Sequence, residues 1–165
     1  HCEIKGKSII LVMADKKLIG FTILGGCTMK KLEFTKSLES GNAFIDAQHK
    51  ALIDSANALA EAVEKRVGLD ASLNTIRFLE EYTRKHFADE ENFMQENNYP
   101  ELEAHKEKHK EFVATVNKLY SDLMLGGRSN FALLDRLQDE ISDWLVNHIM
   151  GTDLKMIAWV NAQNA

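Results

Sequence analysis

Hydrophobic residues along most of the chain recur every three or four positions, which is the period of an amphipathic α-helix. The first such stripe follows Asp46, a residue able to cap a helix, and ends before Gly68. A second stripe opens at Asp70 or Ser72 and continues to Met94. We therefore predict two helices in the first half of the periodic region.

Two further stripes follow a break at residues 97–100. The third ends at residues 126–127, a pair of glycines, and the fourth starts at Ser129 or Asn130 and reaches His148. Because short connections join these amphipathic segments, the pattern predicts an all-α, up-and-down four-helix bundle. A content of one proline and nine glycines in 165 residues agrees with helices and disfavours a β-sandwich.

The start of the chain departs from the helical period. Runs of β-branched and aromatic residues at 8–13 and 18–24 flank a polar turn, which predicts a β-hairpin. Three interpretations remain open for it: the tail of a preceding domain, a segment docked on the bundle, or sequence upstream of a start at Met29. We accordingly divide the chain into an N-terminal extension, residues 1–28, and a four-helix domain, residues 29–165.

Charge and composition exclude several classes of function. The chain has 20 Lys and Arg against 25 Asp and Glu, a net charge of −5, which argues against nucleic-acid binding. Charges at residues 15–17 divide its most apolar stretch into runs shorter than the ~20 residues that span a membrane. Cys2 and Cys27 do not form a disulfide framework, which favours a reducing compartment. We expect a cytoplasmic protein that contacts neither membrane nor nucleic acid.

Candidate chemistry comes from histidines and carboxylates on the predicted helices. His86 and Glu90 lie four residues apart on the second helix, and His105 and His109 do so on the third. Residues with this spacing differ in direction by only about 40°, so each pair faces one way. His49 lies on the apolar stripe of the first helix.

The fourth helix adds His148, and Asp153 follows it by five residues. On an ideal helix these two side chains point about 140° apart. Both face the core only if the backbone loosens near Gly151 and Thr152, which the glycine permits. The core then receives five imidazoles and two carboxylates.

A set of this kind points to bound metal. A single helix histidine is usually a hydrogen-bonded core residue, and Glu90 or Asp153 alone is typical of a solvated face or a cap. Buried together without a cation, they would leave polar groups unsatisfied at about 1–3 kcal/mol each. Seven nitrogen and oxygen donors exceed a tetrahedral zinc site and favour a pair of octahedral ions, iron or manganese. The share of imidazole favours iron.

The order of these seven residues resembles the ligand signature of the hemerythrin family. The flanking segments 45–50, 86–91 and 144–149 are also similar to those of bacterial hemerythrins. The resemblance covers about residues 32–157, and it implies an N-terminal arm before the bundle. One departure is Phe34, since the bacterial proteins usually carry a tryptophan in that arm.

The resemblance implies ligands for two iron ions joined by an oxo or hydroxo bridge. One iron takes three imidazoles, those of His105, His109 and His148. The second iron, which keeps an open position, takes those of His49 and His86. Two carboxylates bridge the ions, those of Glu90 and Asp153.

The function implied is reversible binding of dioxygen, for storage, delivery or sensing, rather than enzyme activity. Leu145 matches a position that lines the oxygen pocket in the family. Two alternatives stay open. One is a diiron peroxidase, a ferroxidase or a nitric-oxide-handling enzyme on the same bundle. The other is a signalling module that responds to oxygen or redox state, whose protein partner the sequence does not identify.

Overall fold

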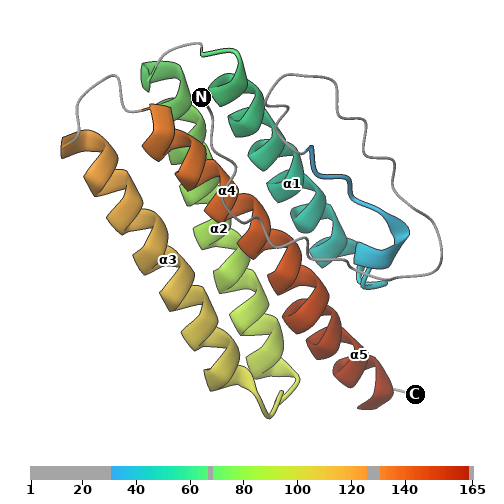
Figure 1. Ribbon diagram of the computed structural model, residues 1–165. Helices are drawn as coiled ribbons and strands as arrows, with labels where there is room; N and C mark the ends of the chain where they lie inside the picture. The colour runs from blue at the N-terminus through green and yellow to red at the C-terminus, as the bar shows by residue number, and fades with distance from the viewer. Residues whose placement is uncertain (1–30, 67–68, 126–130, 164–165) are drawn as a thin grey trace, which may run out of the picture.

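The computed structural model describes residues 31–66, 69–125 and 131–163, and all regular structure in these ranges is helical (Figure 1). The long helices are α1 (Ala43–Glu64), α2 (Leu69–Glu96), α3 (Leu102–Leu125) and α4 (Phe131–His148). A π-helical turn, η2 (Ile149–Asp153), joins α4 to α5 (Leu154–Gln163), and a short 3-10 turn, η1 (Lys36–Leu38), precedes α1.

The four long helices pack in a ring. α1 and α3 each contact both α2 and α4, so α1 is diagonal to α3 and α2 to α4. This arrangement confirms the predicted all-α four-helix bundle. The hairpin predicted in residues 1–28 lies outside the described residues.

The start of α1 differs from the prediction. Asn42, not Asp46, caps the helix: its Oδ1 accepts hydrogen bonds from the backbone N–H groups of Phe44 (3.1 Å) and Ile45 (3.2 Å). The Asp46 carboxylate instead accepts from the N–H groups of Ser40 and Gly41, in the loop before the helix. Asp46 therefore lies inside the first turn, where a negative charge stabilises the helix N-terminus.

Two other helix starts lie close to their predictions. α2 begins at Leu69, one residue before Asp70, and α4 begins at Phe131, directly after Asn130.

The segment before α1 is bound to the bundle by backbone hydrogen bonds. Leu32 donates its N–H to Asn57 Oδ1, and Asn57 Nδ2 donates to the Leu32 carbonyl, both at 2.8 Å. The side chains of Leu32 and Leu38 are buried in the core, and Phe34 packs against it.

The apolar core consists of two clusters separated by a polar layer. The larger cluster contains core residues of all four long helices, among them Leu52, Phe112 and Leu145. The smaller cluster closes one end of the bundle, and its buried members are Ile45, Met94, Tyr99, Met156 and Ile157. Each of the four long helices contributes buried histidines or carboxylates between these clusters, and η2 adds Asp153. The polar layer is therefore enclosed on both sides.

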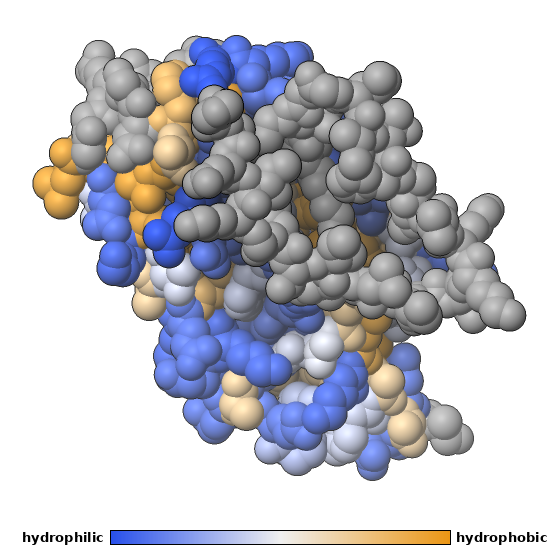
Figure 2. Space-filling model, viewed as in Figure 1, coloured by the Kyte–Doolittle hydropathy of each residue, from blue (hydrophilic) through white to orange (hydrophobic). Residues whose placement is uncertain are grey.

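On the face in Figure 2, hydrophilic residues predominate over the lower half of the molecule. Hydrophobic colour gathers near the C-terminal end of α3, where Met124 and Leu125 are exposed.

The cap at Asn42 can be tested by substitution. Asn42→Ala removes the acceptor for two N–H groups at the start of α1, so we expect the free energy of unfolding to fall by about 1 kcal/mol. Urea denaturation measures this change. The control Asn74→Ala, at an exposed position inside α2, should cause no loss, because alanine is the better helix former. Equal stability of the two variants would contradict the assignment of Asn42 as the cap.

Candidate metal centre

All seven side chains singled out in the sequence meet in the polar layer of the bundle. Each is buried, with a relative exposure between 0% and 4%. They form two overlapping groups whose ligand atoms lie within 4.8 Å of one another and which share Glu90. One group also contains His105, His109 and His148, and the other also contains His49, His86 and Asp153.

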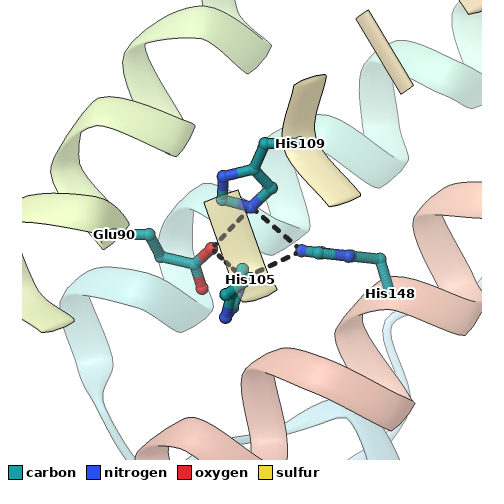
Figure 3. A group of neighbouring side chains, drawn as sticks. All are labelled: Glu90, His105, His109 and His148. Carbon is teal, nitrogen blue, oxygen red and sulfur yellow. Dashed lines mark hydrogen bonds and ion pairs between the residues drawn. The ribbon is translucent and has the colours of Figure 1, made fainter. Parts of the chain in front are cut away.

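Three imidazoles of the first group converge on one another (Figure 3). His148 Nε2 lies 3.1 Å from His105 Nε2 and 3.0 Å from His109 Nε2. A neutral imidazole nitrogen is either a donor or an acceptor, so three converging nitrogens cannot all satisfy one another. Adjacent ligands about 2.1 Å from one octahedral ion stand about 3.0 Å apart. The observed spacing therefore suits coordination of a single ion.

Asp153 faces both groups at once. Its Oδ1 lies 2.9 Å from His148 Nε2 and 3.2 Å from His105 Nε2. Its Oδ2 lies 3.2 Å from His49 Nε2, on the other side of the carboxylate. A carboxylate with one oxygen toward each group is suited to bridging two cations.

Glu90 lies between the same groups from the opposite helix. Its Oε2 is 3.5 Å from the Nε2 atoms of His105 and His109 and 3.7 Å from His86 Nε2. Its Oε1 faces His49 Nε2 at 3.9 Å. These distances place the Glu90 carboxylate beside four imidazoles but are too long for good hydrogen bonds.

Several buried atoms of this layer lack a hydrogen-bond partner among the described residues. Both oxygens of Glu90 and of Asp153, and both ring nitrogens of His49, are buried without a hydrogen bond there. Each such group costs about 1–3 kcal/mol if it stays unsatisfied. A cation bound by these nitrogen and oxygen donors removes that cost, so the residues present fit a metal.

The π-helical turn η2 explains how His148 and Asp153 reach the same point. A residue added to the turn rotates Asp153 toward the core, so both side chains are buried and in contact. This confirms the predicted loosening near Gly151 and Thr152. Gly151 is not required for space, since a Cβ there would meet nothing within 4 Å. Lys108 Nζ on α3 donates to Thr152 Oγ1 at 2.9 Å and ties η2 to the bundle.

The electrostatics of the layer keep its carboxylates ionised. Burial, the largest influence, would raise the pKa of Glu90, but the nearby His105 and His109 imidazoles lower that pKa to about 2. Burial likewise acts against ionisation of Asp153, yet contacts with His105 and other imidazoles hold its pKa well below 3.8. Both side chains are therefore anionic at neutral pH.

The histidines differ from one another. Burial lowers the pKa of His86 to about 4, so its imidazole is neutral at pH 7 and available as a ligand. Burial also opposes the charge on His105, but Asp153 and Glu90 outweigh it and raise its pKa to about 9. A metal that binds at pH 7 must therefore displace a proton from His105.

Residues outside the predicted set orient two of the imidazoles. His86 Nδ1 lies 3.0 Å from Gln48 Oε1, and Gln48 Nε2 donates to Asp89 Oδ2 at 2.6 Å. His109 Nδ1 lies 3.0 Å from Glu91 Oε1. Such contacts fix the tautomer that presents Nε2 to a metal. Sequence reasoning missed these roles. The only local signal is that Gln48, Asp89 and Glu91 are each adjacent to a predicted ligand.

Aromatic rings pack against the ligand imidazoles. The Phe87 ring stacks on His109 with 3.7 Å between ring centroids, and Trp144 stacks on His148 at 4.1 Å. The Phe112 ring also stacks on Trp144, with 4.0 Å between ring centroids. These contacts hold the imidazoles in place and make one side of the layer apolar.

Leu145 lies beside the buried histidines and carboxylates. It lines a small cavity together with His86, His148 and Asp153. The cavity leaves about 10 Å³ for the centre of a water-sized molecule. Its remaining walls are mainly apolar side chains of α2, α3 and α4.

Comparison with known proteins agrees with this geometry. The family model described as "Hemerythrin HHE cation binding domain" matches residues 40–160. A bacteriohemerythrin of Stenotrophomonas maltophilia is 32% identical over 127 residues, which are 76% of this chain and 78% of that protein. A bacteriohemerythrin of Ralstonia nicotianae is 28% identical over 134 residues, 80% of this chain and 90% of that protein.

A myohemerythrin of Theromyzon tessulatum is 30% identical over 111 residues, 67% of this chain and 78% of that protein. Among the described residues, no helix has the length and apolar character needed to cross a membrane. The matched range contains the whole buried layer of histidines and carboxylates, and on these grounds the chain belongs to the hemerythrin family.

Proposed function

We propose that this chain binds two iron ions and takes up dioxygen reversibly, for storage, delivery or sensing. The observation that carries the proposal is the position of Asp153, which turns one oxygen toward His148 and the other toward His49. Glu90 is shared by the same two groups. Membership of the hemerythrin family supports iron as the metal and dioxygen as the ligand.

In this proposal the two irons differ in their ligands. One is held by three imidazoles, those of His105, His109 and His148. The other is held by two, those of His49 and His86, and keeps an open position. When bound, the iron pair with its oxo or hydroxo bridge supplies the redox centre that accepts dioxygen.

The remaining residues control water and protons around that centre. Leu145 and Trp144 are part of an apolar wall beside His86 and His148. Such a wall would exclude water and proton donors from the centre, which would favour release of dioxygen unchanged. We infer that the chain is a binder rather than an enzyme, because this wall favours reversible uptake over turnover.

The number of irons and the role of Glu90 are tested together. Purified protein should carry two irons per chain, one for each group of ligands. Glu90→Ala removes a shared carboxylate, so the iron content should fall to one or less. The control Glu107→Ala, at an exposed position on α3, should keep both irons. Elemental analysis measures the content. Two irons in Glu90→Ala, or one zinc in the parent protein, would contradict the proposal.

Metal binding should release protons at neutral pH. Because the pKa of His105 is raised to about 9, its imidazole carries a proton at pH 7 in the metal-free protein. Ferrous iron should displace about one proton per chain from this residue at pH 7. The apparent affinity should then rise as the pH increases toward 9. Calorimetry in two buffers of different ionisation enthalpy measures the protons released, and zero release would overturn this assignment.

Leu145→Ala tests the apolar wall. The substitution opens space beside His86 without changing a ligand, so both irons should remain while irreversible oxidation becomes about tenfold faster. Visible absorption after repeated exposure to and removal of dioxygen follows this loss. The control Leu137→Ala removes the same atoms from the same helix at a fully buried position. It should lose stability, by about 2–5 kcal/mol, but not oxidise faster.

The same measurement separates binding from catalysis. Reversible uptake in the parent protein supports the binder. Two results together would favour the peroxidase alternative instead. One is immediate irreversible oxidation of the parent protein, and the other is reduction of added peroxide by the protein at the expense of a reducing substrate. If Leu145→Ala oxidises at the same rate as the parent, Leu145 does not contribute to the exclusion of water.

A further inference from the structure

A second cavity lies directly outside the one beside the metal site. It is bounded by side chains of α2 and α3, and Ile141 of α4 contributes to its lining. It leaves about 30 Å³ for the centre of a water-sized molecule. Four residues line both cavities and form the partition between them: Leu79, Thr83, Phe112 and Ile141.

The outer cavity reaches the protein surface. Glu80, Arg84 and Asn117 are among its lining residues, and Arg84 and Asn117 are exposed. Arg84 Nη2 forms an ion pair with Glu80 Oε1 at 2.9 Å. These polar side chains lie at the entrance, and the lining becomes apolar toward Ile141.

The inner cavity reaches the two-histidine group. His86, which belongs to that group, lines the inner cavity but not the outer one. The partition residues are all buried, and each one touches both cavities, so the separation is a single layer of side chains. Passage across a single layer needs displacement of side chains rather than movement of whole helices.

The size and polarity of the two spaces select a class of molecule. Each admits a small molecule such as a diatomic gas. Small apolar cavities accept uncharged gases such as xenon and often stay free of water, because water needs two or more polar partners there. Hydrated ions and peroxide would lose hydrogen bonds on entry.

We propose that dioxygen reaches the metal site between α2 and α3, through the outer cavity and across the partition at Thr83 and Ile141. This route rests on the proposed function for its ligand. It depends on the shape of the chain itself and is open to a test without iron. Added bulk in the partition hinders passage, and removal of a methyl group eases it.

Methyl NMR on the full chain loaded with zinc tests whether dioxygen occupies the two cavities of the route. Zinc is diamagnetic, whereas dissolved dioxygen is paramagnetic and relaxes methyl protons that it approaches. Oxygen should relax the methyls of Val116 in the outer cavity and of Leu145 in the inner one, but not those of Leu59, which lines neither. Relaxation at equilibrium reports the occupancy of a cavity and not the path into it, so this measurement tests whether dioxygen occupies both cavities. No effect at Leu145 in the parent protein would overturn the route.

Stopped-flow uptake by the iron-loaded chain gives the second readout. Thr83→Leu should take up dioxygen about tenfold more slowly than Thr83→Val, which also lacks the hydroxyl but keeps the volume. Ile141→Val should be faster than the parent. The matched control Leu134→Val lies on the same helix and lines neither cavity, so its rate should equal that of the parent. Equal rates in Thr83→Leu and Thr83→Val, at equal iron content, would reject the route.

The two readouts separate the route from the proposed function. Failure of iron-loaded protein to take up dioxygen reversibly would contradict the proposed function, while relaxation by oxygen at both Val116 and Leu145 in the zinc-loaded chain would still show that dioxygen occupies both cavities. The reverse result is reversible uptake at a rate that the Thr83 and Ile141 variants do not change. It would contradict the route and leave the proposed function intact.

Discussion

The burial of two carboxylates among five imidazoles is the constraint on which the rest of the structure depends. Glu90 and Asp153 are fully buried, and none of their oxygens has a hydrogen-bond partner among the described residues. The imidazoles alone do not resolve this, because three of them present Nε2 atoms to one another. A bound cation resolves both problems together, so the bundle is built to be completed by metal. The two apolar clusters on either side hold the polar layer in position, and they also deny water to it.

The local backbone follows from the same constraint. His148 and Asp153 cannot both face the core on a regular helix, so α4 opens into η2 before it continues as α5. A π-helical turn sacrifices regular hydrogen bonds, and such turns concentrate at functional sites. The space around Gly151 does not require a glycine, and contacts with the neighbouring helices restrain the turn. The Lys108–Thr152 hydrogen bond, which spans from α3 to η2, is one such restraint.

Much of the fold and of the site could be predicted because the information was local. The four-residue spacing of His86 and Glu90 fixes their common direction on one helix, and the five-residue spacing of His148 and Asp153 required the irregular turn. Contacts between helices could not be predicted in this way. The pairing of Gln48 with His86 joins residues 38 positions apart and depends on how α1 and α2 are rotated against each other. The cap at Asn42 was missed because Asp46 is equally suited to capping by residue type, and only the path of the preceding loop decides between them.

The apolar residues around the polar layer determine how far water and protons can reach the ligands. Under the proposed function, the ligands alone do not distinguish binding of dioxygen from reaction with it, and access for water and protons is what separates the two. Trp144 shows how closely the two tasks are connected, since its ring stacks on His148 and also lines the inner cavity. A side chain that orients a ligand thereby sets the width of the space beside it. Phe112 continues the stack and belongs to the partition as well. The orientation of the ligand imidazoles and the shape of the two cavities therefore depend on one continuous set of aromatic contacts.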